Sequence, residues 1–112
     1  MATFDDFMKL DLRIGTILEA EPFTEARKPA IKLKIDFGGE QLGIKQSSAQ
    51  ITKRYTPPER LIGRQIAAVV NFPSMRIAGY KSEVLVLGGV PNDTDVVLLH
   101  PDEEVENGTK IS

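Results

Sequence analysis

The 112-residue sequence has no cysteine and a single histidine, His100. Without cysteine, the chain cannot form a disulfide scaffold, a thiolate metal site or a cysteine nucleophile. The lone histidine has no candidate nucleophile to act with, which argues against an enzyme. The spacing of His, Asp and Glu also matches no metal site. Phosphate-binding glycine loops and the Gly-x-Ser-x-Gly nucleophile motif are also absent. We therefore expect no catalysis, no cofactor and no metal.

Long apolar runs are missing as well. No stretch approaches the ~20 residues that cross a bilayer, and residues 1–6 are acidic, so we expect no secretion signal. Hydrophobic residues make up 41% and charged residues 27% of the chain, which is ordinary for a globular protein. This length supports one domain with a modest core, so self-association would add useful burial. The absence of cysteine fits a cytoplasmic location.

Charge is unevenly distributed along the chain, although the formal net charge is only -2. Residues 27–81 contain eleven Lys and Arg against three acidic residues, whereas the segments before and after are both acidic. A basic centre between acidic ends is typical of a protein with an anion-binding face. The alternative is that the cations are spread over every face of a barrel, because neighbours in a strand point to opposite sides.

The apolar pattern predicts a mostly β chain. The first strand is interrupted at Gly15, which indicates a bulge or bend that lets one strand serve both halves of a small barrel. Gly38-Gly39 indicates the hairpin turn between the second and third strands. The expected strands cover residues 10–23, 31–37, 42–45, 65–70, 84–87 and 95–99.

Three short segments predict helical turns, at residues 4–10, 46–55 and 57–63. Thr3 can cap the first, with Asp6 closing a capping box, and Ser47 or Ser48 can cap the second. The third begins at prolines and ends at Gly63. The acidic tail from residue 100 either wraps the barrel or is loose.

This order of elements predicts an all-β fold: a five-stranded oligonucleotide/oligosaccharide-binding (OB) barrel with short helices and N- and C-terminal extensions. A small β-sandwich is the alternative. We expect a single domain over residues 1–112, with the barrel at about residues 10–90.

Residues 71–83 form a loop between two strands rich in Val and Ile, and they suggest a binding surface. The loop carries two cations, an amide, two serine hydroxyls and two aromatic rings. Cations can follow a nucleic-acid backbone while aromatic faces stack on bases. An aromatic residue beside a proline is, however, more often an anchor that packs the loop on the core.

Two kinds of binding site compete at this stage. A nucleic-acid site would contact phosphates and weaken steeply with salt; its candidates are Lys28, Lys32, Lys45, Lys53, Arg54, Asn71, Arg76, Lys81 and Ser82. A peptide site would use an apolar groove; its candidates are Phe37, Phe72, Met75, Ile77 and Tyr80. For Lys32, solubility and protection of a sheet edge explain the charge equally well.

Apolar residues on the N-terminal helix and the last strand predict a homodimer, because a small barrel cannot bury them all. Pairing of identical patches would place two binding faces side by side and hold a flexible polypeptide at two points. The N-terminal helix and the C-terminal extension would lie in this interface. Its candidate residues are Phe4, Phe7, Met8, Val96, Val97, Leu98 and Leu99.

Six segments, taken in order, resemble the CsaA family of small bacterial proteins, which is similar to the tRNA-binding domain of methionyl-tRNA synthetases. They are Leu10–Gly15, Ala26–Ala30, Ile35–Gly38, Gly43–Thr52, Val70–Pro73 and Ile77–Gly88. The resemblance implies an OB barrel that forms a homodimer. It also implies a chaperone role in the export of unfolded preproteins, with tRNA binding as a related activity.

The sequence departs from its relatives at two places. Ser82-Glu83-Val84-Leu85 stands where synthetase domains have Ser-Glu-Gly-Met, which places the chain on the CsaA branch. Ser74-Met75 stands where the family usually has Pro-Arg, so a cation is lost and an apolar side chain is gained. We therefore expect a chaperone that binds preproteins or peptides; a structure-specific tRNA-binding protein is the alternative.

Overall fold

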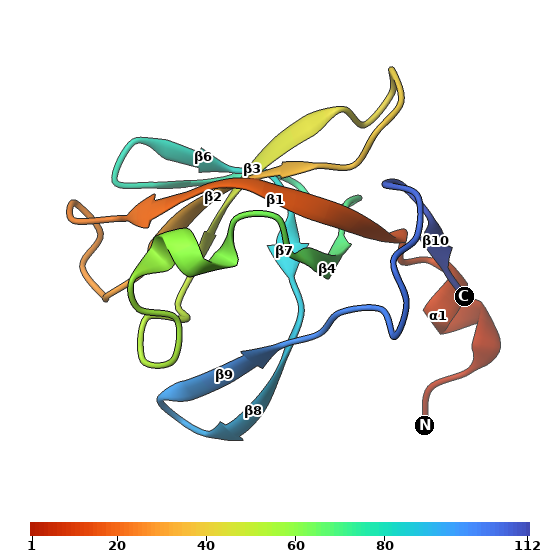
Figure 1. The fold of residues 1–112 in the computed structure, drawn as a ribbon. Coiled ribbons are helices and arrows are strands. Elements are labelled where there is room, and N and C mark those ends of the chain that lie inside the picture. Colours follow the sequence, from red (N-terminus) through yellow and green to blue (C-terminus); the bar gives the residue numbers. More distant parts are fainter.

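The computed structural model describes residues 1–112 and consists mainly of antiparallel strands (Figure 1). The elements are α1 Phe4–Met8, β1 Leu12–Pro22, β2 Ile31–Asp36, β3 Ile44–Ala49, the 3-10 helix η1 Pro58–Leu61, β4 Gln65–Val69, β5 Met75–Ile77, β6 Tyr80–Ser82, β7 Leu85–Val86, β8 Gly88–Asn92, β9 Asp95–Leu98 and β10 Lys110–Ile111. The sheet order β3-β2-β1-β4-β7 forms a nearly closed barrel, which confirms the predicted OB fold. No helix is long and apolar enough to span a membrane.

The long strand β1 organises the barrel because it pairs with both neighbouring strands in turn. Residues Leu12–Thr16 pair with β4, and Thr16–Pro22 pair with β2. The register with β2 shifts between Ile17 and Glu19, so Leu18 is an extra residue. A bulge of this kind bends a strand and increases its twist. The predicted bent first strand is confirmed, with the irregularity just after the position of Gly15.

Side chains close the barrel between β3 and the segment that leads into β7. The Ser47 hydroxyl donates to the Val84 carbonyl at 2.9 Å, and the Ser82 hydroxyl accepts from the Ser48 amide at 3.0 Å. The predicted helical turn capped by Ser47 or Ser48 is therefore wrong. Ser47 lies opposite Leu33 of β2 and is buried, so its hydroxyl requires an internal partner.

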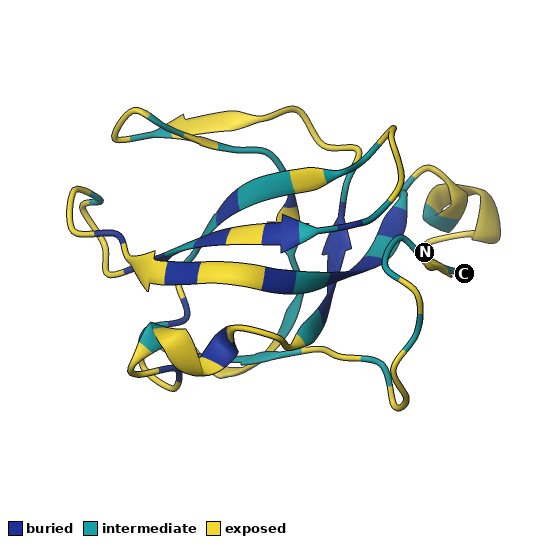
Figure 2. Cartoon of the chain, turned by 45° about the horizontal axis from the view of Figure 1, so that its top comes forward, coloured by how far each residue is buried: buried dark blue, intermediate teal, exposed yellow.

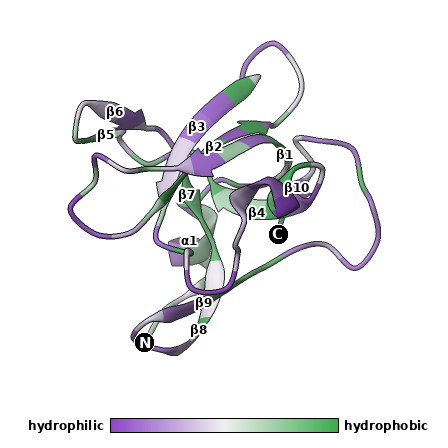
Figure 3. Cartoon of the chain, turned by 60° about the vertical axis from the view of Figure 1, so that its left-hand side comes forward, coloured by the Kyte–Doolittle hydropathy of each residue, from purple (hydrophilic) through white to green (hydrophobic).

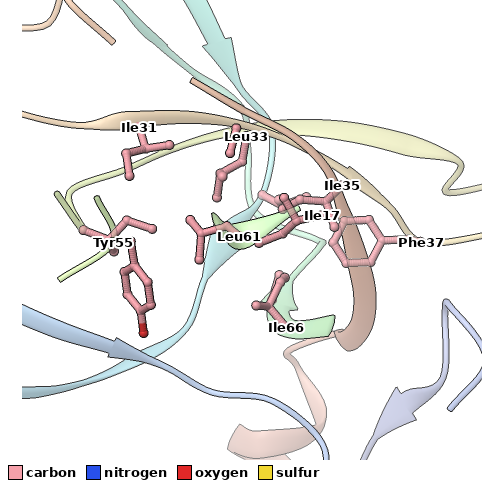
Figure 4. Close-up of a cluster of buried hydrophobic side chains, with 12 residues drawn as sticks. Ile17, Ile31, Leu33, Ile35, Phe37, Tyr55, Leu61 and Ile66 are labelled. Carbon is pink, nitrogen blue, oxygen red and sulfur yellow. The ribbon is translucent and has the colours of Figure 1, made fainter. Parts of the chain in front are cut away.

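The barrel interior is filled by aliphatic side chains together with Phe37 and Tyr55 (Figure 4). Figure 2 shows buried and exposed residues alternating along the barrel strands, as expected for strands with one buried face. The 3-10 helix η1 contributes Leu61, and the chain leaves it through Gly63, as the prolines and the glycine predicted. The largest fully buried apolar side chains are Phe37, Ile17, Ile31, Leu33, Ile35, Leu61 and Ile66.

Phe37 belongs to this core, so its predicted role as a peptide contact is wrong. Its side chain is 1% exposed. A Cβ at Gly15 would lie 2.8 Å from the Phe37 ring, so only glycine lets β1 approach it this closely. Phe37 continues the alternation of apolar residues Ile31, Leu33 and Ile35, which are all buried.

The acidic tail wraps the barrel, which decides between the two alternatives left open by the sequence. β10 pairs with Leu12 and Arg13 of β1. The Gly108 amide donates to the Ile14 carbonyl at 2.7 Å, and the Ile14 amide donates to the Thr109 carbonyl at 3.0 Å. These bonds extend the sheet beside the first residues of β1, which do not pair with β2.

The strands β8 and β9 form a separate hairpin that projects from the barrel (Figure 1). Asp95, which is 7% exposed, accepts from Arg54 Nε at 3.0 Å and from Nη2 at 2.5 Å. The hydrogen bond and the charge of Arg54 lower the pKa of Asp95 below its usual range. The Tyr55 hydroxyl also accepts from the Leu98 amide at 2.9 Å. Arg54 and Tyr55 therefore attach this hairpin to the barrel.

The helix α1 begins as predicted. The Thr3 hydroxyl accepts from the Asp6 amide, and the Asp6 carboxylate accepts from the Thr3 amide. No residue of the helix is buried, and Phe4 and Met8 are 73% and 48% exposed. The helix thus presents Phe4 and Met8 to solvent in the single chain, while Phe7 is half-buried.

Candidate binding groove

Residues 71–83 contain a second hairpin, formed by β5 and β6. Ala78 and Gly79 connect its strands, and both have positive φ, as a type I′ turn requires. Arg76 lies opposite Lys81, and Ile77 lies opposite Tyr80. Side chains of successive residues point to opposite faces. The two cations therefore share one face of the hairpin, and Ile77 and Tyr80 share the other.

A groove of about 480 Å³ lies between this hairpin and the loop that connects β1 to β2. Both segments lie at the same end of the barrel (Figure 1), and Figure 3 shows hydrophilic and hydrophobic residues mixed along the hairpin. OB barrels bind their ligands between these two loops and over the second and third strands. The groove is lined by Ala26, Arg27, Lys28, Ala30, Ser48, Gln50, Ile77 and Ala78.

The rings near the hairpin anchor it to the barrel. Tyr80 packs edge-on against the buried ring of Phe23, with 5.4 Å between centroids, and its hydroxyl donates to the Leu33 carbonyl at 3.2 Å. Burial, followed by nearby carboxylates, raises the pKa of Tyr80 to about 12. The anchor is therefore Tyr80 and not Phe72, the aromatic beside a proline for which the anchoring role was considered. Phe72 and Met75, by contrast, are 44% and 64% exposed.

Three of the predicted phosphate-binding cations are held in ion pairs. Lys32 Nζ lies 3.4 Å from Glu25 and within 5.1 Å of the ring centroids of Phe23 and Tyr80. Lys45 lies 3.9 Å from Glu83, and Arg54 binds Asp95 as described above. These three side chains connect segments of the protein to one another.

The other four predicted cations, Lys28, Lys53, Arg76 and Lys81, have no carboxylate within 4.0 Å. Lys28 lines the groove, and Arg76 and Lys81 belong to the hairpin that forms one wall. Arg27 also lines the groove, but it was not among the residues predicted from the sequence. Its position next to Lys28 in a charged loop could have identified it.

Two predicted polar contacts have structural roles. The Asn71 side chain donates to the Lys9 carbonyl at 2.9 Å and accepts from the Asp11 amide at 2.9 Å. It therefore ties the start of the hairpin segment to the connection between α1 and β1. The Ser82 hydroxyl accepts the Ser48 amide in the barrel seam.

Residues 12–110 match the model of the family described as "Putative tRNA binding domain". The chain belongs to this family. It also matches two crystal structures of CsaA chaperones over their full length. The chaperone CsaA from Bacillus anthracis str. Ames is 70% identical, with a TM-score of 0.93, and the match covers 100% of this chain and 99% of that one. The CsaA chaperone from Picrophilus torridus is 51% identical, with a TM-score of 0.89, and the match covers 100% of both chains.

The family also includes domains of larger enzymes. The methionine–tRNA ligase of Methanococcoides burtonii is 40% identical over 111 residues, which are 99% of this chain and 16% of the ligase. The chain therefore spans about one sixth of the length of this curated relative. The resemblance to the CsaA family and to the tRNA-binding domain of synthetases, inferred from six sequence segments, is confirmed.

Proposed function

We propose that this protein is a cytoplasmic, non-enzymatic chaperone that binds unfolded segments of polypeptide, with preproteins for export as its clients. The similarity to CsaA chaperones over their entire length supports this function. The observation that carries it is the groove itself, which has an aliphatic lining of Ala26, Ala30, Ile77 and Ala78. Such a surface can take apolar side chains of an extended segment.

The aromatic residues favour a polypeptide over single-stranded nucleic acid. Proteins that bind single strands usually offer aromatic faces on which bases stack. Here Phe23 and Phe37 are 3% and 1% exposed, and Tyr80 is packed against Phe23. No ring lines the groove. The exposed thioether of Met75 adds a flexible apolar contact near its wall.

A specific observation supports tRNA binding as a second candidate function. Arg27 and Lys28 line the groove, and Arg76 and Lys81 lie on the opposite face of its hairpin wall, all without a carboxylate partner. Phosphates could neutralise these cations. Binding of that kind releases counterions and falls steeply with added salt, whereas burial of apolar side chains does not.

The two candidates are separated by measuring binding to an unfolded apolar peptide and to bulk tRNA side by side over a range of salt. We expect peptide binding that persists at high salt and weaker tRNA binding. Ile77→Gln should weaken peptide binding roughly ten-fold, because the groove loses an apolar side chain that the bound peptide would cover. Ile62→Gln is the matched control, since Ile62 is 50% exposed and lies outside the groove. Tight, salt-sensitive tRNA binding with no peptide binding would make this a tRNA-binding protein.

The proposal includes a homodimer formed through the apolar surface of α1 and the end of β9. Phe4, Met8 and Leu99 are 73%, 48% and 47% exposed. Phe7 and the β9 residues Val96, Val97 and Leu98 are half-buried. A second copy could cover the exposed members of this set through an isologous contact, whereas Val96 and Leu98 already pack against the core of their own chain. The mass in solution at micromolar concentration should therefore be twice the protomer mass of 12.4 kDa, and a monomeric mass would contradict the dimer.

A further inference from the structure

A second cavity, of about 500 Å³, continues the binding groove toward the β8–β9 hairpin. The two spaces share Lys28 and Gln50, so one extended ligand could occupy both. Their chemistry differs, because Val96 is the only hydrophobic residue in the lining of the second cavity. That cavity is lined by Lys28, Pro29, Gln50, Thr52, Lys53, Asp93, Thr94 and Val96.

The second cavity carries an excess of positive charge. Neither Lys28 nor Lys53 has a carboxylate within 4.0 Å. The Lys53 ammonium donates to the Thr94 hydroxyl at 3.4 Å, which places its charge beside the β8–β9 turn. Asp93 is the one acidic residue in the lining, and the neighbouring Asp95 is already neutralised by Arg54. Two lysines therefore face one carboxylate.

We propose that this polar cavity binds an acidic side chain of the client. The chaperone would then prefer extended segments that carry an apolar residue and, a few positions away, Asp or Glu. An extended chain advances about 3.3 Å per residue, so one short segment can reach from the aliphatic groove into the cavity. This inference rests on the proposed polypeptide-binding function and names the class of client. The groove favours a carboxylate over an RNA phosphate because it offers no ring for base stacking.

The test uses a series of labelled, unstructured peptides, each with one leucine cluster and one glutamate. The number of residues between the cluster and the glutamate differs from peptide to peptide, and the glutamate stands either before or after the cluster. Each peptide has a partner in which glutamine replaces the glutamate. At one spacing, the glutamate peptide should bind about five-fold tighter than its partner at low salt. Lys53→Met should bring this ratio close to one. Lys34→Met is the matched control, because Lys34 lies outside both cavities and pairs with Glu19.

Each other result overturns the inference. Equal binding of glutamate and glutamine peptides at every spacing would refute it and leave the proposed function intact. Failure of both peptides to bind would refute the proposed function as well. A glutamate preference that survives in Lys53→Met would place the anion elsewhere. If Lys53→Met weakens binding of a single-stranded RNA and leaves the peptide ratio unchanged, the cavity serves phosphates.

Discussion

Replacing Phe37 by alanine should lower the free energy of unfolding by about 4 kcal/mol, which corresponds to a fall in Tm of roughly 15 °C. The side chain is 1% exposed and fills the barrel next to Ile35 and Gly15, so its removal leaves a cavity. A domain of this size is stabilised by about 5–15 kcal/mol in total, so the variant should be close to unfolding at 37 °C. Urea denaturation followed by circular dichroism measures the change.

Phe72→Ala is the matched control for this experiment. Phe72 and Phe37 were both predicted as peptide contacts, and of the two Phe72 is the exposed one, at 44%. Its removal should change stability by about 1 kcal/mol or less, because a surface substitution leaves no cavity. A stability loss in Phe37→Ala no larger than that in Phe72→Ala would show that Phe37 is not part of the core.

Substituting Gly108 by alanine should cost about 3 kcal/mol and detach the C-terminal tail. Gly108 has a φ of +91°, and a Cβ there would collide with the backbone carbonyl oxygen of Phe37. An L-residue in this left-handed region is strained by about 1–2 kcal/mol. The collision adds to the strain because a backbone oxygen cannot move aside as a flexible side chain can. The bonds that join Gly108 and Thr109 to Ile14 should then lengthen or break.

Gly63→Ala separates the strain from the collision. Gly63 has nearly the same φ, +92°, but no atom lies within 4 Å of a Cβ at that position. Its substitution should cost only about 1–2 kcal/mol. Hydrogen exchange gives a second measurement, because the amides of Ile14 and Gly108 should lose protection only in Gly108→Ala. Equal losses of stability and unchanged protection would mean that the tail accommodates the methyl group.

The elements predicted well were those that depend on neighbours along the chain. The capping box of Thr3 and Asp6, the alternating strand at residues 31–36 and the short helix between Pro58 and Leu61 all follow from local patterns. Ser47 shows where this reasoning fails. Its polar neighbours suggest a turn, but pairing with Leu33 and a hydrogen bond to Val84 make it a buried strand residue.

The candidate site shows the same division. Sequence reasoning identified basic residues and apolar residues that lie at the groove, including Lys28 and Ile77. It could not tell which cations are free. Lys28 and Lys32 are four positions apart and were predicted for the same role, yet Lys32 is paired with Glu25 and packed against two rings.

The sequence by itself determined the all-β OB architecture and the family, because both depend on residue types at set positions along the chain. Only the tertiary structure decided that Tyr80 packs on Phe23 while Phe72 is exposed, and that Arg54 is paired with Asp95 while Lys53 has no carboxylate partner. The physical reason is the short distance over which these interactions act. Burial and ion pairing act over a few ångströms, and the groups that come this close here are often more than 30 residues apart in the chain.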